Sequence, residues 1–177
     1  CWWNRLPSSL ASLDESRQLD CYALIMGFDI KTVDLEAAYL QSLWPYDPKL
    51  PETECFISVP KELRRWLPED LREPSNSMRK PMWRLKRPGY GHPASGHLWC
   101  ETLRKWLLTQ GWTQVGRPGK GSLFFKGKCL LASYVDDLKL AGPAEEQKVF
   151  WAALGGIDGS PGAFNWKAAP EILREFL

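Results

Sequence analysis

Residues 130–142 read LLASYVDDLKLAG and give the clearest indication of how this chain folds. Two apolar runs flank the adjacent carboxylates Asp136 and Asp137, a pattern typical of a β-hairpin with the Asp pair at its turn. Two anions held this close repel each other, and a bound cation relieves the repulsion. Carboxylate oxygens suit Mg²⁺ or Mn²⁺. Asp is also a common turn residue, so the motif alone leaves a metal site and a plain turn open.

A further carboxylate, Asp34, lies at the end of a second predicted strand. Residues 28–35 alternate apolar and polar side chains as a half-buried strand does, and residues 36–40 are helix-forming. A central antiparallel sheet would bring Asp34 close to Asp136. A two-metal site for phosphoryl transfer needs carboxylates from separate elements at one point. The alternative is that Asp34 only caps the helical segment after it.

The rest of the chain alternates helices and strands. Apolar spacing predicts helices over residues 10–25, 61–67 and 144–154, and one of about four turns that Gly111 ends; strands over residues 55–59, 82–86, 123–125 and 129–135; and loops over residues 74–78, 88–96 and 155–162. The last fifteen residues carry no assignment. This order predicts an α+β fold in which an antiparallel sheet has helices packed on one face.

Composition limits the classes of protein. At 177 residues the chain is long enough for one domain with a substantial core. No apolar run reaches the roughly 20 residues that span a bilayer, and no signal peptide is visible, so we expect an intracellular protein without a membrane partner. The five cysteines are scattered, which predicts free, mostly buried thiols rather than a zinc ribbon or a disulfide framework. The start at Cys1 suggests a fragment of a longer protein.

Positive charge is concentrated in residues 61–87. The net charge of the chain is only +2, but this stretch holds nine Lys and Arg against four Asp and Glu. Trp66 and Trp83 are interleaved with the basic residues. Such a tract can follow a phosphate backbone, and a solvated surface loop is the alternative.

Four blocks, in this order, resemble the reverse transcriptase of copia-type LTR retrotransposons. They are VDLEAAYLQ (33–41), CFISVP (55–60), LKRPGYGHPASGHLW (85–99) and YVDDLKLAG (134–142). The resemblance covers about residues 19–154 and leaves residues 155–177 unassigned, within a single fragment spanning residues 1–177. It implies a right-hand polymerase palm with partial fingers, and RNA-directed DNA polymerase activity that transfers nucleotides from a dNTP to a primer 3′-hydroxyl.

The resemblance also implies a metal site with two Mg²⁺ or Mn²⁺ ions. Asp34, Asp136 and Asp137 match the catalytic, metal-binding aspartates of the family. Asp34 and Asp136 would bridge both ions, and Asp137 would be more peripheral. Leu35 would offer its backbone carbonyl to the nucleotide-bound ion.

Five further residues carry implied binding roles. Tyr39 matches the aromatic residue beneath the incoming sugar, where a ring collides with a 2′-hydroxyl; its alternative is a core aromatic. Tyr90 and Gly91 match the block that lies against template and nucleotide. Arg84 and Lys86 are candidates for contacts with triphosphate or template phosphates.

The implied partners are an RNA or DNA template with its primer, a dNTP, and the missing thumb, ribonuclease H and integrase regions of a polyprotein. The implied location is a cytoplasmic virus-like particle or the nucleus. Two other functions stay open. One is a non-catalytic nucleic-acid-binding module that uses the basic tract and the aromatic residues. The other is an inactive transposon relic.

Overall fold

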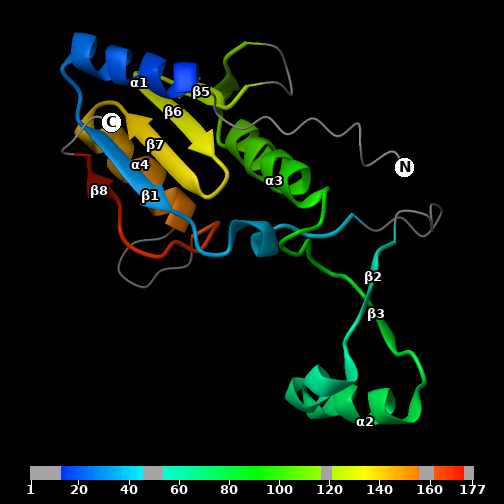
Figure 1. The fold of residues 1–177 in the computed structure, drawn as a ribbon. Coiled ribbons are helices and arrows are strands. Elements are labelled where there is room, and N and C mark those ends of the chain that lie inside the picture. The colour runs from blue at the N-terminus through cyan, green and yellow to red at the C-terminus, as the bar shows by residue number, and fades with distance from the viewer. Residues whose placement is uncertain (1–12, 46–53, 117–120, 156–161, 174–177) are drawn as a thin grey trace.

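The centre of the molecule is a six-stranded antiparallel sheet in the order β4-β5-β6-β7-β1-β8 (Figure 1). The computed structural model describes residues 13–45, 54–116, 121–155 and 162–173. The sheet strands are β1 (Ile30–Asp34), β4 (Thr113–Gln114), β5 (Leu123–Lys126), β6 (Cys129–Tyr134), β7 (Asp137–Ala141) and β8 (Glu171–Ile172). The helices are α1 (Leu13–Met26), α2 (Glu69–Ser77), α3 (Ser95–Thr109) and α4 (Ala144–Gly155), with 3-10 helices η2 (Ala38–Gln41) and η4 (Lys61–Trp66).

Strands β6 and β7 form the predicted hairpin at the middle of the sheet. Tyr134 pairs with Asp137, so Val135 and Asp136 are the two loop residues and Asp137 already belongs to β7. The strands predicted over residues 123–125 and 129–135 form a second hairpin, β5–β6, in which Lys126 pairs with Cys129. Strand β1 pairs with the other side of β7. The two carboxylate-bearing segments are therefore neighbours in the sheet.

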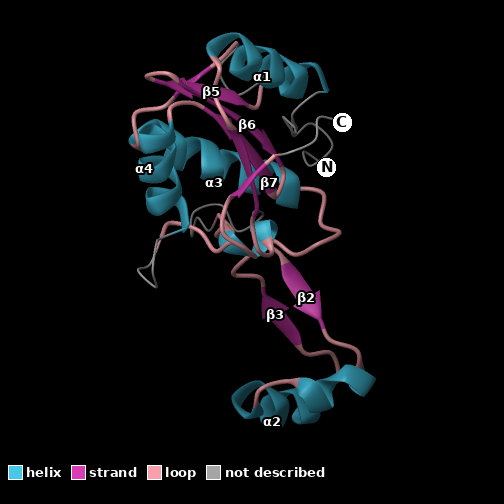
Figure 2. Ribbon diagram, turned by 90° about the vertical axis from the view of Figure 1, so that its left-hand side faces the viewer, coloured by secondary structure: helices cyan, strands magenta, loops and turns pink. Residues whose placement is uncertain are grey.

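Both faces of the sheet are covered by helices (Figure 2). Leu131, Leu138 and Leu140 belong to the core that contains α3 and α4. Ala132 and Ala141, which alternate with them along the strands, belong to a smaller core that contains α1. The prediction of an antiparallel α+β sheet is confirmed, and the prediction that the helices lie on one face is wrong. Small side chains on the second face let α1 approach, where it buries Leu19 and Ala23.

A separate two-stranded ribbon projects from the sheet (Figures 1 and 2). It consists of β2 (Phe56–Ser58) and β3 (Met82–Arg84), with η4 and α2 between them. The loop predicted over residues 74–78 is wrong for residues 74–77, which belong to α2 despite Pro74 inside the helix. Arg72 explains part of this, because its guanidinium donates to the Leu67 carbonyl just before the helix at 3.0 and 3.2 Å.

Residues 162–173, here called the C-terminal segment, lie along β1. For most of them the sequence predicted no structure. Strand β8 pairs with β1 through Lys31 and Ile172, and Leu35 forms an isolated bridge with Trp166. This segment therefore runs beside the strand that ends at Asp34.

The cysteines correct another expectation. Among the described residues Cys129 is buried, Cys21 is exposed, and Cys55 and Cys100 lie between, so "mostly buried" is wrong. None of these four forms a disulfide, as predicted, while Cys1 lies outside the described residues. The predicted start of the first helix, at residues 10–12, and most of the loop predicted over residues 155–162 lie there too. In the described part of the chain, no helix is long and apolar enough to cross a bilayer.

Gln147 fastens α4 to the sheet. Its side chain is fully buried, and its amide Nε2 donates to the carbonyls of Asp29 and Gly142, each at 2.8 Å. These carbonyls lie just before β1 and just after β7. One amide group therefore satisfies backbone acceptors from two strands that meet in the sheet.

Replacing Gln147 by Met should lower the free energy of unfolding by about 1–3 kcal/mol, because one buried and one partly buried carbonyl lose their donor while the side-chain volume is kept. Urea unfolding measures this change. Lys148→Met, at the next position and exposed, is the control and should change the free energy by less than about 0.5 kcal/mol. Equal effects of the two substitutions would contradict the assigned role of Gln147.

Candidate active site

The β6–β7 turn is held in an uncommon backbone conformation. Val135 has φ = +53°, which is rare for a β-branched residue, and it is the first of the two loop residues. The carbonyl of the second loop residue, Asp136, accepts a hydrogen bond from the backbone N–H of Leu35 at 2.8 Å. That bond joins the turn directly to the end of β1.

Three carboxylates meet at this end of the sheet. Asp34 and Asp137 are directly opposite each other in the β1–β7 ladder, and Asp136 precedes Asp137. The pKa of Asp137 is raised, first because the surrounding protein displaces water from it, and then because the negative charges of Asp136 and Asp34 oppose its ionised form. Lys167 acts in the opposite direction. The structure thus brings together the three aspartates that the sequence singled out.

Lys167 is the cation at this cluster. Its ammonium Nζ lies 2.5 Å from Oδ2 of Asp34, and its own backbone N–H donates to the Asp34 carbonyl at 3.0 Å. The hydrogen bond to Asp34, followed by the charges of Asp34, Asp136 and Asp137, raises the pKa of Lys167. One residue of the C-terminal segment therefore holds Asp34 twice: the Lys167 side chain binds its carboxylate, and the Lys167 backbone N–H binds its backbone carbonyl.

Gln41 ties the same segment to η2. Its amide donates to the carbonyls of Glu36 and Asn165, and its carbonyl oxygen accepts from the Asn165 backbone N–H. Sequence reasoning missed both Gln41 and Lys167. For Lys167 the sequence does hold a signal: Phe164 and Trp166 alternate with polar neighbours, which is the pattern of a short strand.

The donors present fit a divalent cation in their chemistry. Among the described residues, no group of three or more His, Cys, Asp or Glu side chains has an arrangement that could hold a metal ion. Oδ1 of Asp34 is nevertheless buried without a hydrogen-bond partner, and Oδ2 is occupied by Lys167. Carboxylate oxygens in this setting are the ligands that Mg²⁺ and Mn²⁺ prefer.

Two tyrosines lie beside the carboxylates. The rings of Tyr39, on η2, and Tyr90 are 4.9 Å apart and tilted by 41°. Burial is the main cause that raises the pKa of Tyr39; Cys100, Asp136 and other nearby groups add to it. The site therefore includes Tyr39 and Tyr90, from elements before and after the ribbon.

Gly91, the neighbour of Tyr90, takes a left-handed conformation with φ = +88°. A side chain added there would meet no atom within 4 Å, so the backbone angle is what requires glycine here.

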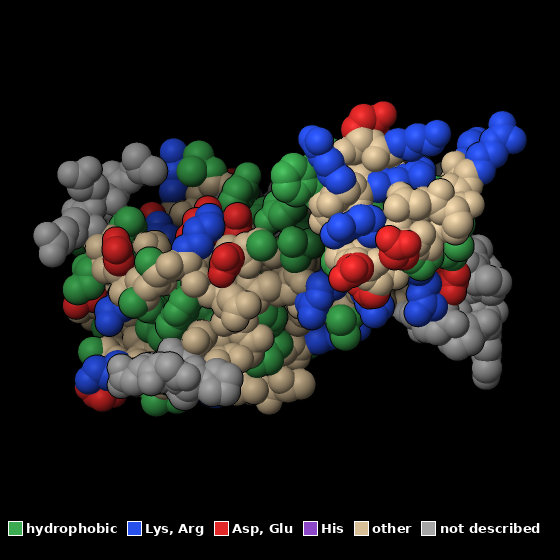
Figure 3. Space-filling view, turned by 90° about the horizontal axis from the view of Figure 1, so that it is seen from below, with side chains coloured by type: hydrophobic (Ala, Val, Ile, Leu, Met, Phe, Trp, Pro, Cys, Tyr) green, Lys and Arg blue, Asp and Glu red, His purple; other side chains and the backbone are tan. Residues whose placement is uncertain are grey.

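Of the two residues predicted to contact phosphates, Arg84 lies at the end of the ribbon and Lys86 just after it. Arg84, on β3, pairs with Glu54 at 3.3 Å, and the Lys86 carbonyl accepts from the Trp44 backbone N–H. Arg87 donates to the Leu40 carbonyl at 2.7 Å and so joins the base of the ribbon to η2. Figure 3, seen from below, shows Lys and Arg side chains gathered over the ribbon.

Comparisons with known proteins give one weak structural similarity. No family model matches the chain, and no curated protein matches it. A solved structure of telomerase from Candida albicans, in complex with a TWJ fragment of telomeric RNA, is similar with a TM-score of 0.39 and 13% identity. The match covers 95% of this chain and 32% of that one, so the chain spans about a third of its length. The copia-type resemblance stays a prediction from the sequence blocks.

Asp137→Asn should stabilise the protein at neutral pH. A raised pKa in the folded state means that ionised Asp137 is disfavoured there, so stability falls as the pH rises from the unfolded pKa, near 4, through the folded one. At pH 7 the penalty is fully present. Because the side chain is partly exposed and screened, the gain should be at most about 1 kcal/mol.

Thermal melts of wild type and Asp137→Asn in low salt should diverge more at pH 7 than at pH 4. Asp70→Asn, in the first turn of α2, is the control and should give no gain, because it removes a charge that favours that helix. A stability difference between wild type and Asp137→Asn that stays constant between pH 4 and 7 would show that folding does not raise the pKa of Asp137.

Proposed function

We propose that the chain is the palm, with partial fingers, of a copia-type RNA-directed DNA polymerase. One observation carries the proposal. Asp34 lies opposite Asp137 in the β1–β7 ladder, and the Asp136 carbonyl is bonded to Leu35, so carboxylates from separate elements meet at one sheet end. Phosphoryl transfer by two metal ions needs this convergence.

Asp34 and Asp136 would hold both cations, with Asp137 more peripheral and the Leu35 carbonyl on the nucleotide-bound ion. Two Mg²⁺ or Mn²⁺ ions, when bound, would activate the primer 3′-hydroxyl and stabilise the departing pyrophosphate. The protein itself supplies no nucleophile. Its contribution is to hold the three carboxylates on adjacent strands and to keep one oxygen of Asp34 buried and unpaired. Lys167 would leave Oδ2 of Asp34 when a cation takes its place.

The aromatic residues beside the carboxylates support a nucleotide site. Tyr39 stacks obliquely on Tyr90 and lies close enough to Asp136 for that charge to affect its pKa. A ring in this position would meet the 2′-hydroxyl of a ribonucleotide. Tyr90 is exposed and Gly91 turns the backbone next to it, which leaves both accessible to a nucleotide or template.

The ribbon is the proposed contact for template and triphosphate phosphates. Arg84 ends β3 and Lys86 follows it by two residues. Figure 3 shows Lys and Arg side chains gathered over the ribbon, and cations along a surface suit a nucleic-acid backbone. A template with primer, a dNTP, and the thumb, ribonuclease H and integrase regions of a polyprotein would be the partners.

A non-catalytic nucleic-acid-binding module, or an inactive relic, is the second candidate. One observation favours it: the Lys167 ammonium already neutralises Asp34, as it would in a purely structural ion pair. Such a module would bind template through the ribbon and would not depend on the aspartates. The following experiment separates the two candidates.

Asp136→Asn should lower primer extension on an RNA template by about 100-fold or more, because charge stabilisation at the reacting phosphate is lost. The assay uses Mg²⁺, a dNTP and the chain restored to its full-length context. Glu145→Gln, exposed at the start of α4, is the control and should leave the rate unchanged. If template binds but neither the wild type nor Asp136→Asn extends the primer, the chain is a binding module. Equal, measurable extension by both would remove Asp136 from the proposed metal site.

Tyr39→Ala should relax the preference for deoxynucleotides by about 10-fold or more, because the ring that excludes a 2′-hydroxyl is removed. Tyr39→Phe keeps the ring and should keep the preference. Single-nucleotide incorporation with dNTP and rNTP measures the ratio of kcat/KM values. An unchanged ratio in Tyr39→Ala would remove Tyr39 from this role.

A further inference from the structure

The turn that carries Asp136 is fastened from a second side, by α3. Trp99 is fully buried in the core, and its indole Nε1–H donates to the Val135 carbonyl at 2.5 Å. The next carbonyl, that of Asp136, accepts from Leu35. Both carbonyls of the two-residue loop are therefore held, one by a side chain and one by the backbone of β1.

The conformation of Val135 explains why the turn needs such a bond. Left-handed backbone angles cost an L-residue roughly 1–2 kcal/mol, and β-branched residues adopt them least readily. Glycine is the usual residue at the first loop position of a two-residue hairpin that has a positive φ there. Without the bond from Trp99, the peptide group after Val135 would rotate to relieve this strain. That rotation would change the direction of the Asp136 side chain.

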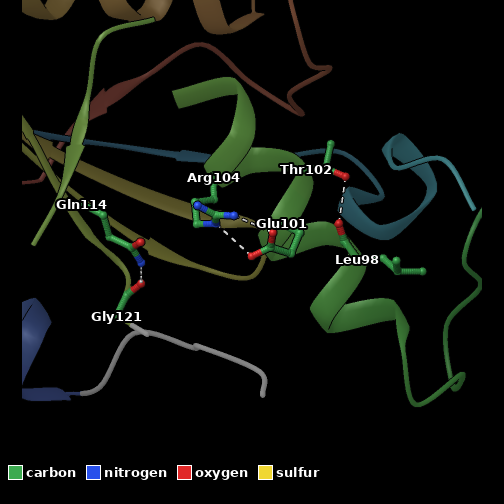
Figure 4. Close-up of polar contacts among 6 residues, drawn as sticks. All are labelled: Leu98, Glu101, Thr102, Arg104, Gln114 and Gly121. Atoms are coloured by element: carbon green, nitrogen blue, oxygen red, sulfur yellow. Dashed lines mark hydrogen bonds and ion pairs between the residues drawn. The ribbon is translucent and has the colours of Figure 1, made fainter. Parts of the chain in front are cut away.

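The donor itself is rigidly placed. The Trp99 ring packs edge-on against Phe164, with centroids 5.3 Å apart, and Leu103 of the next helical turn is also buried. Contacts along α3 add to this (Figure 4): Arg104 makes two bonds to Glu101, at 2.7 and 2.9 Å. An indole held this firmly can hold a strained peptide, whereas a mobile one would follow it.

We infer that Trp99 is a positioning residue: its indole N–H holds the Val135 peptide so that the Asp136 and Asp137 carboxylates face Asp34. The catalytic part of this inference rests on the proposed polymerase function. The structural part, that the hydrogen bond from Trp99 fixes the backbone conformation of the β6–β7 turn, rests on the geometry alone. Trp99 touches no reacting group and is not a catalytic residue.

The decisive variant is Trp99→Phe, which keeps an aromatic ring in the core but removes the N–H. Trp106→Phe is the matched control, because Trp106 lies on the same helix and packs edge-on against the same Phe164, at 5.4 Å. Both substitutions shrink one core ring. Only the first removes the bond to the turn.

Mn²⁺ binding, followed by electron paramagnetic resonance without substrate, should weaken about 10-fold or more in Trp99→Phe and stay within about twofold in Trp106→Phe. Backbone amide chemical shifts of Asp136 and Asp137 should move in the first variant alone. The kcat of primer extension should fall about 10- to 100-fold, with little change in the KM for template. Equal behaviour of the two variants in these measurements would overturn the inference.

Val135→Gly provides the rescue, because glycine adopts the positive φ without a tether. Added to Trp99→Phe, it should restore at least half of the lost Mn²⁺ affinity on a logarithmic scale. A double variant no better than Trp99→Phe would mean that lost packing, not the turn, causes the defect. If Trp99→Phe fails to fold, benzothienylalanine at position 99, with sulfur in place of the N–H, tests the same bond at nearly constant volume.

The two failures are distinguishable. If the wild type extends no primer, yet Trp99→Phe shifts the amide resonances of Asp136 and Asp137 and weakens Mn²⁺ binding, the positioning role of Trp99 stands and the polymerase proposal fails. If the wild type extends primers and Trp99→Phe behaves like Trp106→Phe, the polymerase proposal stands and the positioning role of Trp99 fails.

Discussion

Repulsion between carboxylates at one end of the sheet is a cost that the surrounding structure must offset. Like charges directly opposite each other in an antiparallel ladder are destabilising, and Asp34 and Asp137 are such a pair. The core beneath them outweighs this cost. Fully burying one leucine contributes about 1.5–3 kcal/mol, and Leu131, Leu138 and Leu140 are all completely buried in the adjoining strands. Burial of the core therefore determines which strands pair, and this pairing places Asp34 opposite Asp137 despite their repulsion.

Other parts of the fold are arranged around that charge. The C-terminal segment crosses beside β1 and supplies Lys167, whose ammonium compensates Asp34. A protein selected for stability alone would remove the carboxylates instead of adding a partner for one of them. An oxygen of Asp34 is still buried without a partner. Strained Val135 lies in the same turn, and a cluster of such local costs is characteristic of a functional site.

Much of this was predictable from local sequence. The alternation in residues 28–35 and the apolar runs around Asp136 specify strands, because side-chain direction in a strand repeats every two residues. From the sequence we expect an antiparallel sheet to bring Asp34 close to Asp136. That Asp34 lies directly opposite Asp137 comes from the structure alone. The 3-10 helices and α2 are harder to predict from the sequence. Pro74 is typical of a helix end, yet it lies inside α2. The hydrogen bond from Arg72 to the Leu67 carbonyl helps to stabilise this helix.

Local sequence specifies the hairpin, the strand that ends in Asp34, and the candidate carboxylates, because each depends on residues close together in the chain. The other features depend on contacts between distant segments. Apolar side chains on both faces of β6 and β7 cannot tell which face receives α1. The bonds of Lys167 to Asp34 and of Trp99 to Val135 join segments distant in sequence. Such contacts form only when the core brings their elements together, so no local pattern encodes them.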